Sequence, residues 1–181
     1  MQVERTPLEG LLIIRPRIFR DPRGYFFEPF NARDFAAATG LGITFVQDNE
    51  SRSDAGVLRG LHLQLPPHAQ AKLVRVVAGA VLDVCVDIRP DSPTFGRHWS
   101  VRLDAEQKNM LFIPTGFAHG FVALKNGTIL TYKCSDHYAP SLERTIRWDD
   151  PDLGIEWGVR SPIVSDRDRQ GIPFSSMAWM N

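Results

Sequence analysis

The segment "AKLVRVVAGAVLDVCVDIRP", residues 71–90, indicates the fold more strongly than any other part of the chain. It contains two apolar runs rich in valine, separated by Ala78 and Gly79. Runs of this length and composition are typical of buried β-strands. A glycine between two such runs predicts a tight turn that joins consecutive strands.

Shorter strand-like segments lie on both sides of this unit and are separated by glycine, proline, asparagine or aspartate. They are "LLIIRPRIF" (11–19), "YFFEPF" (25–30), "ITFVQDNES" (43–51), "RHWSVRLD" (97–104), "NMLFIP" (109–114), "HGFVALK" (119–125) and "GTILTYKCSD" (127–136). Pro16 has no amide hydrogen, which predicts that part of the first segment lies at a sheet edge. Short strands that recur about every ten residues are typical of an antiparallel sandwich or barrel.

Helix signals are few. Asn31 is an expected N-cap and Gly40 an expected stop around an alanine-rich segment, and Ser165 and Gly171 could bound a second short helix. The turn-rich tail, residues 148–171, is expected to pack over the barrel. The sequence therefore predicts a mainly β, antiparallel barrel (jelly roll) with a few short peripheral helices, as a single domain spanning residues 1–181; the motif described below indicates the cupin type.

Composition excludes several classes of protein. The 21 basic and 21 acidic side chains balance, so no global charge points to nucleic acid. No apolar run approaches the ~20 residues that span a membrane, and the N-terminus has no apolar core of a signal peptide. A cytoplasmic location is therefore expected, with Cys85 and Cys134 as reduced, buried thiols.

A motif skeleton surrounds "GVLRGLHLQLPP", residues 56–67. Many cupin-type barrels bind a metal through two histidines at this motif, a following glutamate and a later histidine. Here His62 and His119 stand at ligand positions, but Gln64 and Lys72 replace the second histidine and the glutamate. An ammonium group repels a divalent cation and attracts an anion. The sequence therefore predicts a site that works without a metal.

The residue types of this skeleton suit proton transfer in an anionic substrate. His62 could move a proton near neutral pH, and Lys72 could stabilise an oxyanion. Arg59 could bind phosphate, and Tyr132 on a later strand could return a proton. Taken alone, each of these side chains has an ordinary structural interpretation, as a core, edge or solvated residue. Their place in one skeleton favours the chemical interpretation.

The segments "VLRGLHLQLPPHAQAKLVRV", "SPTFG" and "IPTGFAHGF" resemble the dTDP-4-dehydrorhamnose 3,5-epimerase family of the cupin superfamily. The resemblance runs from "RDPRGYFFE" (20–28) to "SDRD" (165–168) and covers nearly the whole chain. It implies inversion of C3 and C5 beside the C4 ketone of a dTDP-4-keto-6-deoxy-hexose, in dTDP-L-rhamnose synthesis and without a cofactor. It also implies that His62 is the general base, Asp168 its partner, Tyr132 the general acid and Lys72 the stabiliser of the enolate.

The resemblance implies a set of substrate-binding residues as well. These are Arg23, Phe26, Glu28, Gln47, Asp48, Asn49, Arg59, His119, Tyr138, Glu143 and Arg167. At Arg167 the family often has lysine, which keeps the charge but changes the geometry of the contact. Family members form homodimers with strand exchange, so we expect residues 23–28 to reach the site of a partner subunit.

Three alternatives remain open at the level of sequence. A related enzyme could epimerise only C3 or only C5 for a secondary-metabolite sugar. A non-catalytic cupin could bind the nucleotide sugar and would not need His62 or Asp168. A metal-dependent cupin enzyme is disfavoured by Gln64 and Lys72.

Overall fold

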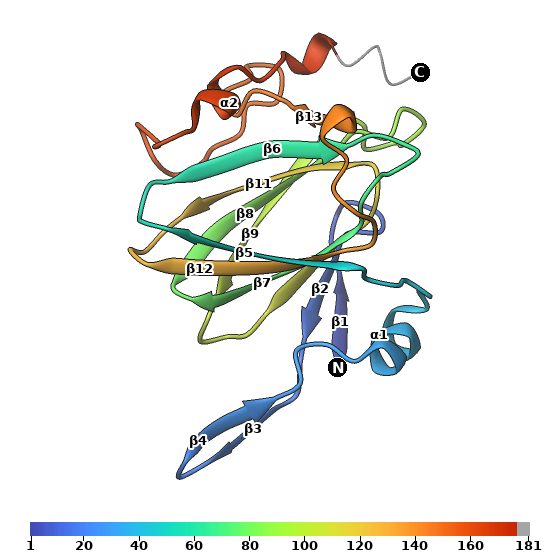
Figure 1. Cartoon of the computed structure of the whole chain (residues 1–181), viewed down its shortest axis with the longest axis vertical. Coiled ribbons are helices and arrows are strands. Elements are labelled where there is room, and N and C mark those ends of the chain that lie inside the picture. The colour runs from blue at the N-terminus through green and yellow to red at the C-terminus, as the bar shows by residue number, and fades with distance from the viewer. Residues whose placement is uncertain (177–181) are drawn as a thin grey trace.

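The structure, a computed structural model, describes residues 1–176 and consists mainly of two antiparallel sheets that face each other (Figure 1). The first sheet has the strand order β1 (Gln2–Arg5), β2 (Leu12–Arg15), β10 (Met110–Ile113), β7 (Lys72–Ala78), β12 (Thr128–Cys134) and β5 (Gln47–Ser53). The second has the order β13 (Glu143–Thr145), β6 (Leu58–Gln64), β11 (Phe117–Ala123), β8 (Ala80–Asp87) and β9 (His98–Asp104). The predicted mainly β, antiparallel fold is confirmed, although hydrogen bonding leaves two sheets rather than a closed ring.

The chain changes sheet at Gly79. The strands on either side of this turn do not pair with each other: β7 lies between β10 and β12, whereas β8 lies between β11 and β9. Gly79 has a φ of +77°, and a Cβ atom on it would lie 2.3 Å from Thr128 Oγ1 and 2.9 Å from Thr128 Cα. The glycine is therefore required for a sharp corner against β12. The expected tight turn is present, and it joins two different sheets.

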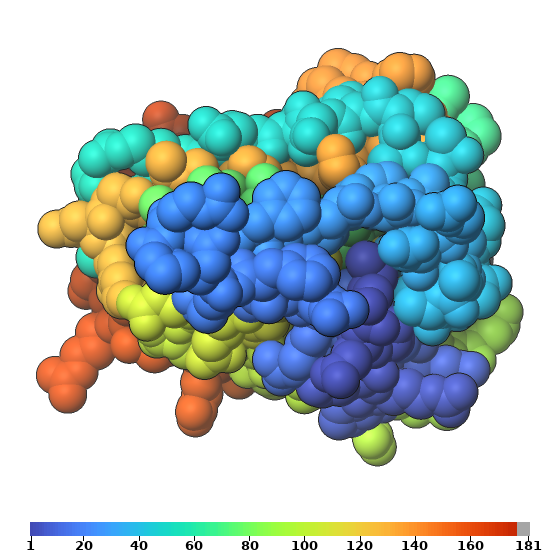
Figure 2. All heavy atoms as spheres, turned by 90° about the horizontal axis from the view of Figure 1, so that it is seen from below, coloured from blue at the N-terminus to red at the C-terminus, as the bar shows by residue number. Residues whose placement is uncertain are grey.

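Residues 11–19 form two strands rather than one. β2 ends at Arg15, just before Pro16, and lies inside the first sheet between β1 and β10. The chain then leaves the barrel as a separate hairpin of β3 (Ile18–Asp21) and β4 (Gly24–Phe27). This hairpin projects from the lower end of the barrel in Figure 1 and points toward the viewer in Figure 2. Pro16 thus marks the end of a strand, because it cannot donate to the ladder.

Both expected helices are present. The side chain of Asn31 accepts hydrogen bonds at the start of α1 (Ala32–Thr39), and Gly40 ends this helix with a φ of 75°. Ser165 caps α2 (Asp166–Arg169), which ends at Gln170 rather than at the expected Gly171. A short 3₁₀ helix, Pro140–Leu142, precedes β13, and residues 174–176 form another 3₁₀ turn. None of the helices within residues 1–176 is long and apolar enough to cross a membrane.

The core has three parts. One fills the space between the sheets, one lies under α1, and one lies between the second sheet and the tail. In the last of these, Leu153 and Trp157 of the tail pack against Leu61 of β6 and Val84 of β8. The expected packing of the tail over the barrel is confirmed, and Cys85 and Cys134 are both free and buried.

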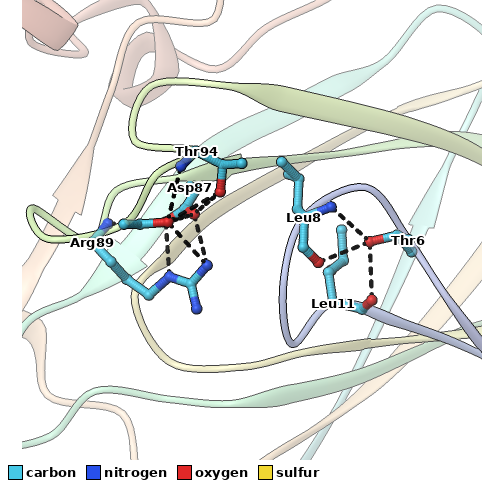
Figure 3. Close-up of polar contacts among 7 residues, drawn as sticks. Thr6, Leu8, Leu11, Asp87, Arg89 and Thr94 are labelled. Atoms are coloured by element: carbon cyan, nitrogen blue, oxygen red, sulfur yellow. Dashed lines mark hydrogen bonds and ion pairs between the residues drawn. The ribbon is translucent and has the colours of Figure 1, made fainter.

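The end of β8 is held by a buried ion pair. Asp87 accepts hydrogen bonds from Arg89 Nε at 2.8 Å and Nη2 at 2.6 Å, and also from the hydroxyls of Ser92 and Thr94 (Figure 3). Burial opposes the charge on Asp87, but these hydrogen bonds lower the pKa of its carboxyl to about 2. The loop after β8 is therefore anchored electrostatically.

Candidate active site

A pocket of about 450 Å³ opens between the two sheets. Its wall combines inward-facing side chains of β5, β6, β7, β11 and β12 with residues of α2 and the segment before β13. The residues that line it include His62, Lys72, Tyr132, Asp168, Arg59, His119, Asn49, Tyr138, Glu143 and Arg167. The four residues expected to carry the chemistry therefore lie in one pocket, as do six of the expected binding residues. A second, more apolar cavity of about 510 Å³ shares Lys72 as part of its wall.

His62 and Asp168 form a close pair. His62 Nε2 lies 2.6 Å from Asp168 Oδ1. Ser165, the N-cap of α2, donates its hydroxyl to Asp168 Oδ2 at 2.9 Å and accepts from the Asp168 amide. Burial raises the pKa of the Asp168 carboxyl, but hydrogen bonds from His62, Ser165 and the Gly60 amide outweigh burial and hold the pKa below its usual value. Because Nε2 faces this carboxylate, Nδ1 is the nitrogen of His62 left for a substrate.

Lys72 and Tyr132 lie together on the first sheet. The Lys72 ammonium is 5.8 Å from the centroid of the Tyr132 ring. Burial lowers the pKa of Lys72, and surrounding groups that include Glu143 and Asp83 oppose this shift. Burial also raises the pKa of the Tyr132 hydroxyl, so Tyr132 keeps its proton at neutral pH. The pocket therefore holds a basic amine and a neutral proton donor beside the histidine.

A second histidine–aspartate pair lies next to the first. His119 on β11 is the register partner of His62 on β6. Its Nε2 lies 2.9 and 3.0 Å from the two carboxylate oxygens of Asp83 on β8. Asp83 is not among the residues expected from the sequence. The available signal was a carboxylate inside the apolar run "VLDVCVDI", which is costly to bury without a partner.

The rim of the pocket is a connected group of polar side chains. Tyr138 donates its hydroxyl to Glu143 Oε2 at 2.5 Å, and Arg167 pairs with the same carboxylate. Burial raises the pKa of Glu143, but the Arg167 and Tyr138 hydrogen bonds keep it below its usual value. Arg59 enters from β6, where its Nε donates to Ser53 Oγ at 3.1 Å. These contacts orient two guanidinium groups, of Arg59 and Arg167, in the lining of the pocket.

The segment at the start of β5 contributes less directly than expected. Gln47 accepts from the Tyr138 amide at 2.9 Å and donates to Asn49 Oδ1 at 3.1 Å, so it supports two pocket residues. Asp48 points away from the pocket interior and pairs with Lys133 at 2.9 Å. Asn49 itself lines the pocket, together with Glu50 and Ser51, which the sequence analysis did not single out.

Besides Gln47 and Asp48, three expected binding residues lie outside the pocket of their own chain. Arg23 and Phe26 are on the projecting hairpin, and Glu28 follows it; all three are exposed. Arg23 pairs there with Asp21 at 2.5 Å. A single chain therefore does not bring these residues to the catalytic pair.

Gln64, at the position of a missing metal ligand, has a structural function. Its amide nitrogen donates to the carbonyl oxygens of His68 and His137, at 2.9 Å for His137, and its oxygen accepts from the Ala139 amide at 2.8 Å. The side chain thus ties together the loops before β7 and before β13. No cluster of three or more metal-ligating side chains occurs within residues 1–176.

Comparison with known proteins agrees with this geometry. A family model described as dTDP-4-dehydrorhamnose 3,5-epimerase matches residues 5–176. A dTDP-4-dehydrorhamnose 3,5-epimerase from Shigella flexneri is 50% identical over 174 residues, which cover 96% of each protein.

Solved structures show the same relationship. The epimerase from Legionella pneumophila Philadelphia 1, in complex with dTDP-4-keto-L-rhamnose, has a TM-score of 0.92 and 44% identity, over 96% of this chain and 93% of that one. A 3'-monoepimerase from Streptomyces bikiniensis, in complex with dTDP-quinovose, has a TM-score of 0.89 and 38% identity, over 97% and 88% of the two chains. The chain belongs to the dTDP-4-dehydrorhamnose 3,5-epimerase family, whose members are isomerases.

Proposed function

We propose that this protein converts dTDP-4-dehydro-6-deoxy-D-glucose to dTDP-4-dehydro-L-rhamnose by inverting C3 and C5 without a metal. The observation that carries the proposal is the His62–Asp168 pair, at 2.6 Å, in one pocket with Lys72 and Tyr132. Both carbons flank the C4 ketone, so loss of their protons gives an enolate. An enolate forms only if charge on the ketone oxygen is stabilised.

Each residue has a defined step in this reaction. His62 Nδ1 takes the proton from the carbon, and the C–H electrons move into the enolate with charge on the C4 oxygen. Asp168 supports the imidazolium that forms, and the Lys72 ammonium stabilises the oxyanion. Tyr132 then donates its proton to the opposite face of the same carbon, which inverts the centre. His62 then releases its proton to solvent and Tyr132 regains one, which resets both groups. The same steps at the second carbon complete the conversion.

The charged rim supports the choice of a nucleotide sugar. Arg59 and Arg167 are guanidinium groups, which match phosphate oxygens in pairs. Tyr138 is half exposed at the rim, where its ring could stack on the thymine base. These features favour a diphosphate at the mouth and the sugar beside His62.

The projecting hairpin supports a homodimer. Phe19, Tyr25 and Phe26 expose 48%, 53% and 68% of their surfaces, which is unusual for aromatic side chains on a short two-stranded element. We propose that the hairpin packs on a second copy and brings Arg23, Phe26 and Glu28 to the partner's pocket. Analytical ultracentrifugation should show a dimer, and deletion of residues 18–27 should abolish both dimer and activity.

Solvent exchange tests the reaction and its regiochemistry together. In deuterium oxide, wild-type protein with the 4-keto-6-deoxyglucose nucleotide should give deuterium at both C3 and C5, as read by proton NMR. Deuterium at one carbon only would instead establish a monoepimerase, and deuterium at neither carbon would leave only a binding function. The rates should be unchanged after dialysis against a strong chelator; loss of activity that a transition metal restores would contradict the metal-free mechanism.

A further inference from the structure

Asp83 is a carboxylate in the barrel interior to which the proposed reaction gives no step. It projects from β8 on the same face as Val81 and Cys85, which belong to the core between the sheets. Its side chain is 0% exposed. Within residues 1–176, His119 is the only hydrogen-bond partner of this carboxylate. A buried charge is costly unless it is paired, so Asp83 and His119 must be considered as a unit.

Asp83 determines which nitrogen of His119 is available to a ligand. A carboxylate only accepts hydrogen bonds, so Nε2 of His119 carries a hydrogen and donates it to Asp83. No side chain or backbone group within residues 1–176 bonds to Nδ1 of His119. His119 also lines the catalytic pocket beside His62. Nδ1 is therefore the ring nitrogen that remains for a molecule in the pocket.

The two histidine–aspartate pairs differ in their surroundings. The His62 side chain is 28% exposed, whereas that of His119 is 8% exposed. Asp168 has further donors in Ser165 and Gly60, whereas Asp83 has His119 alone. The first pair can therefore exchange a proton with a bound substrate, while the second is more enclosed and is fixed by a single contact.

We propose that Asp83 is a positioning residue for substrate binding, which orients His119 so that Nδ1 forms a hydrogen bond with an oxygen-bearing group of the dTDP-sugar. This inference rests on the proposed function, because that function supplies the ligand. Asp83 touches no substrate atom and acts through His119.

Substitution by alanine and by asparagine separates orientation from charge. Asp83→Ala removes the acceptor and should raise KM for the nucleotide sugar roughly tenfold, about the effect of one hydrogen bond. Asp83 is also the weakest of the groups that favour charge on Lys72, so kcat should fall by much less than KM rises. Asp83→Asn keeps a carbonyl oxygen that can accept from Nε2–H, so it should restore most of the wild-type KM. A wild-type KM in Asp83→Ala, or equal losses in both variants, would overturn the positioning role.

A double-mutant cycle tests whether Asp83 acts through His119. In a His119→Ala background, Asp83→Ala should produce no additional rise in KM, because the contact that it orients is already absent. Additive losses would overturn the inference. Nitrogen-15 shifts of the His119 ring measure its tautomer ratio independently. The Nε2–H form should dominate in the wild type and lose its dominance in Asp83→Ala. An unchanged tautomer ratio would count against the proposal.

Asp87→Ala is a matched control. Asp87 lies on the same strand and its side chain is also 0% exposed, but it pairs with Arg89 and does not line the catalytic pocket. This variant should lower the melting temperature and leave KM unchanged. A rise in KM equal to that of Asp83→Ala would assign the effect to general loss of packing and overturn the inference. If the wild type itself neither binds nor converts the nucleotide sugar, the proposed function fails, which is a different outcome from failure at Asp83 alone.

Discussion

Replacement of Asp168 by asparagine should abolish the general-base function of His62 while leaving the pocket intact. In the native protein one carboxylate oxygen faces His62, and the group also accepts from Ser165 and from the Gly60 amide. Asparagine has a single acceptor oxygen, for which these two fixed donors compete with His62. When the amide oxygen turns toward Ser165 and Gly60, the NH₂ group faces His62 Nε2 and forces that nitrogen to accept.

The consequence for catalysis is a change of tautomer. His62 then carries its hydrogen on Nδ1, the nitrogen that should take the substrate proton. General base catalysis contributes about 10²- to 10⁴-fold to rate, so kcat should fall by roughly 10³-fold. KM should change little, because the residues of the rim stay in place. The loss of a charge-assisted hydrogen bond should also cost about 2 kcal/mol of stability.

The assay is deuterium incorporation at C3 and C5, followed by proton NMR under saturating substrate. Asp166→Asn is the matched control, because Asp166 is exposed on the same helix and makes no contact with His62. That variant should retain wild-type rates. A kcat for Asp168→Asn within tenfold of the wild type would refute the orientation argument. The same substitution is expected to be mild at Asp83, where no second donor competes for the amide oxygen.

Three further predictions concern Lys72, Gly79 and Asp87. Lys72→Met should lower exchange at both carbons by about 10²- to 10³-fold, since it removes the cation beside the enolate oxygen; a change confined to KM would contradict this role. Gly79→Ala should destabilise the protein by about 3 kcal/mol in urea unfolding, because the new Cβ atom would clash with Thr128 and the backbone has a positive φ. Gly42→Ala, which has open space around it, should have little effect. The depressed pKa of Asp87, about 2, contributes about 2 kcal/mol of stability above pH 4, and this contribution is lost as the pH falls toward 2. The urea midpoints at pH 5 and pH 2.5 should therefore differ less in Asp87→Asn than in the wild type.

Local signals in the sequence located most elements of the fold. The caps at Asn31 and Gly40 and the apolar runs on both sides of Gly79 lie where the structure has a helix and two strands. Strand pairing was less accessible, because each partner comes from a distant part of the chain. The tight turn expected at Gly79 is present, but its local sequence does not show that the turn joins two different sheets. The single domain over residues 1–181 and the cytoplasmic location stay predictions.

The site was predictable where a motif identified its residues. His62, Lys72, Tyr132 and Asp168 meet in one pocket, as expected, and their individual roles stay predictions. Asp83 was missed because alternation along a buried strand does not show which face a polar residue occupies. Its pairing with a histidine from the neighbouring strand depends on register, which the sequence does not state directly.

The contacts of Gln64 link the loss of a metal ligand to the packing of two loops. A return to histidine at this position would leave the His137 carbonyl and the Ala139 amide without their partner, and a lysine would still occupy the position of the glutamate ligand. Restoring the metal-binding pattern would therefore take at least two substitutions, at Gln64 and at Lys72. The substitution at Gln64 would also release the two loops that its side chain connects. In this chain the metal-free state is tied to loop packing as well as to the chemistry of the pocket.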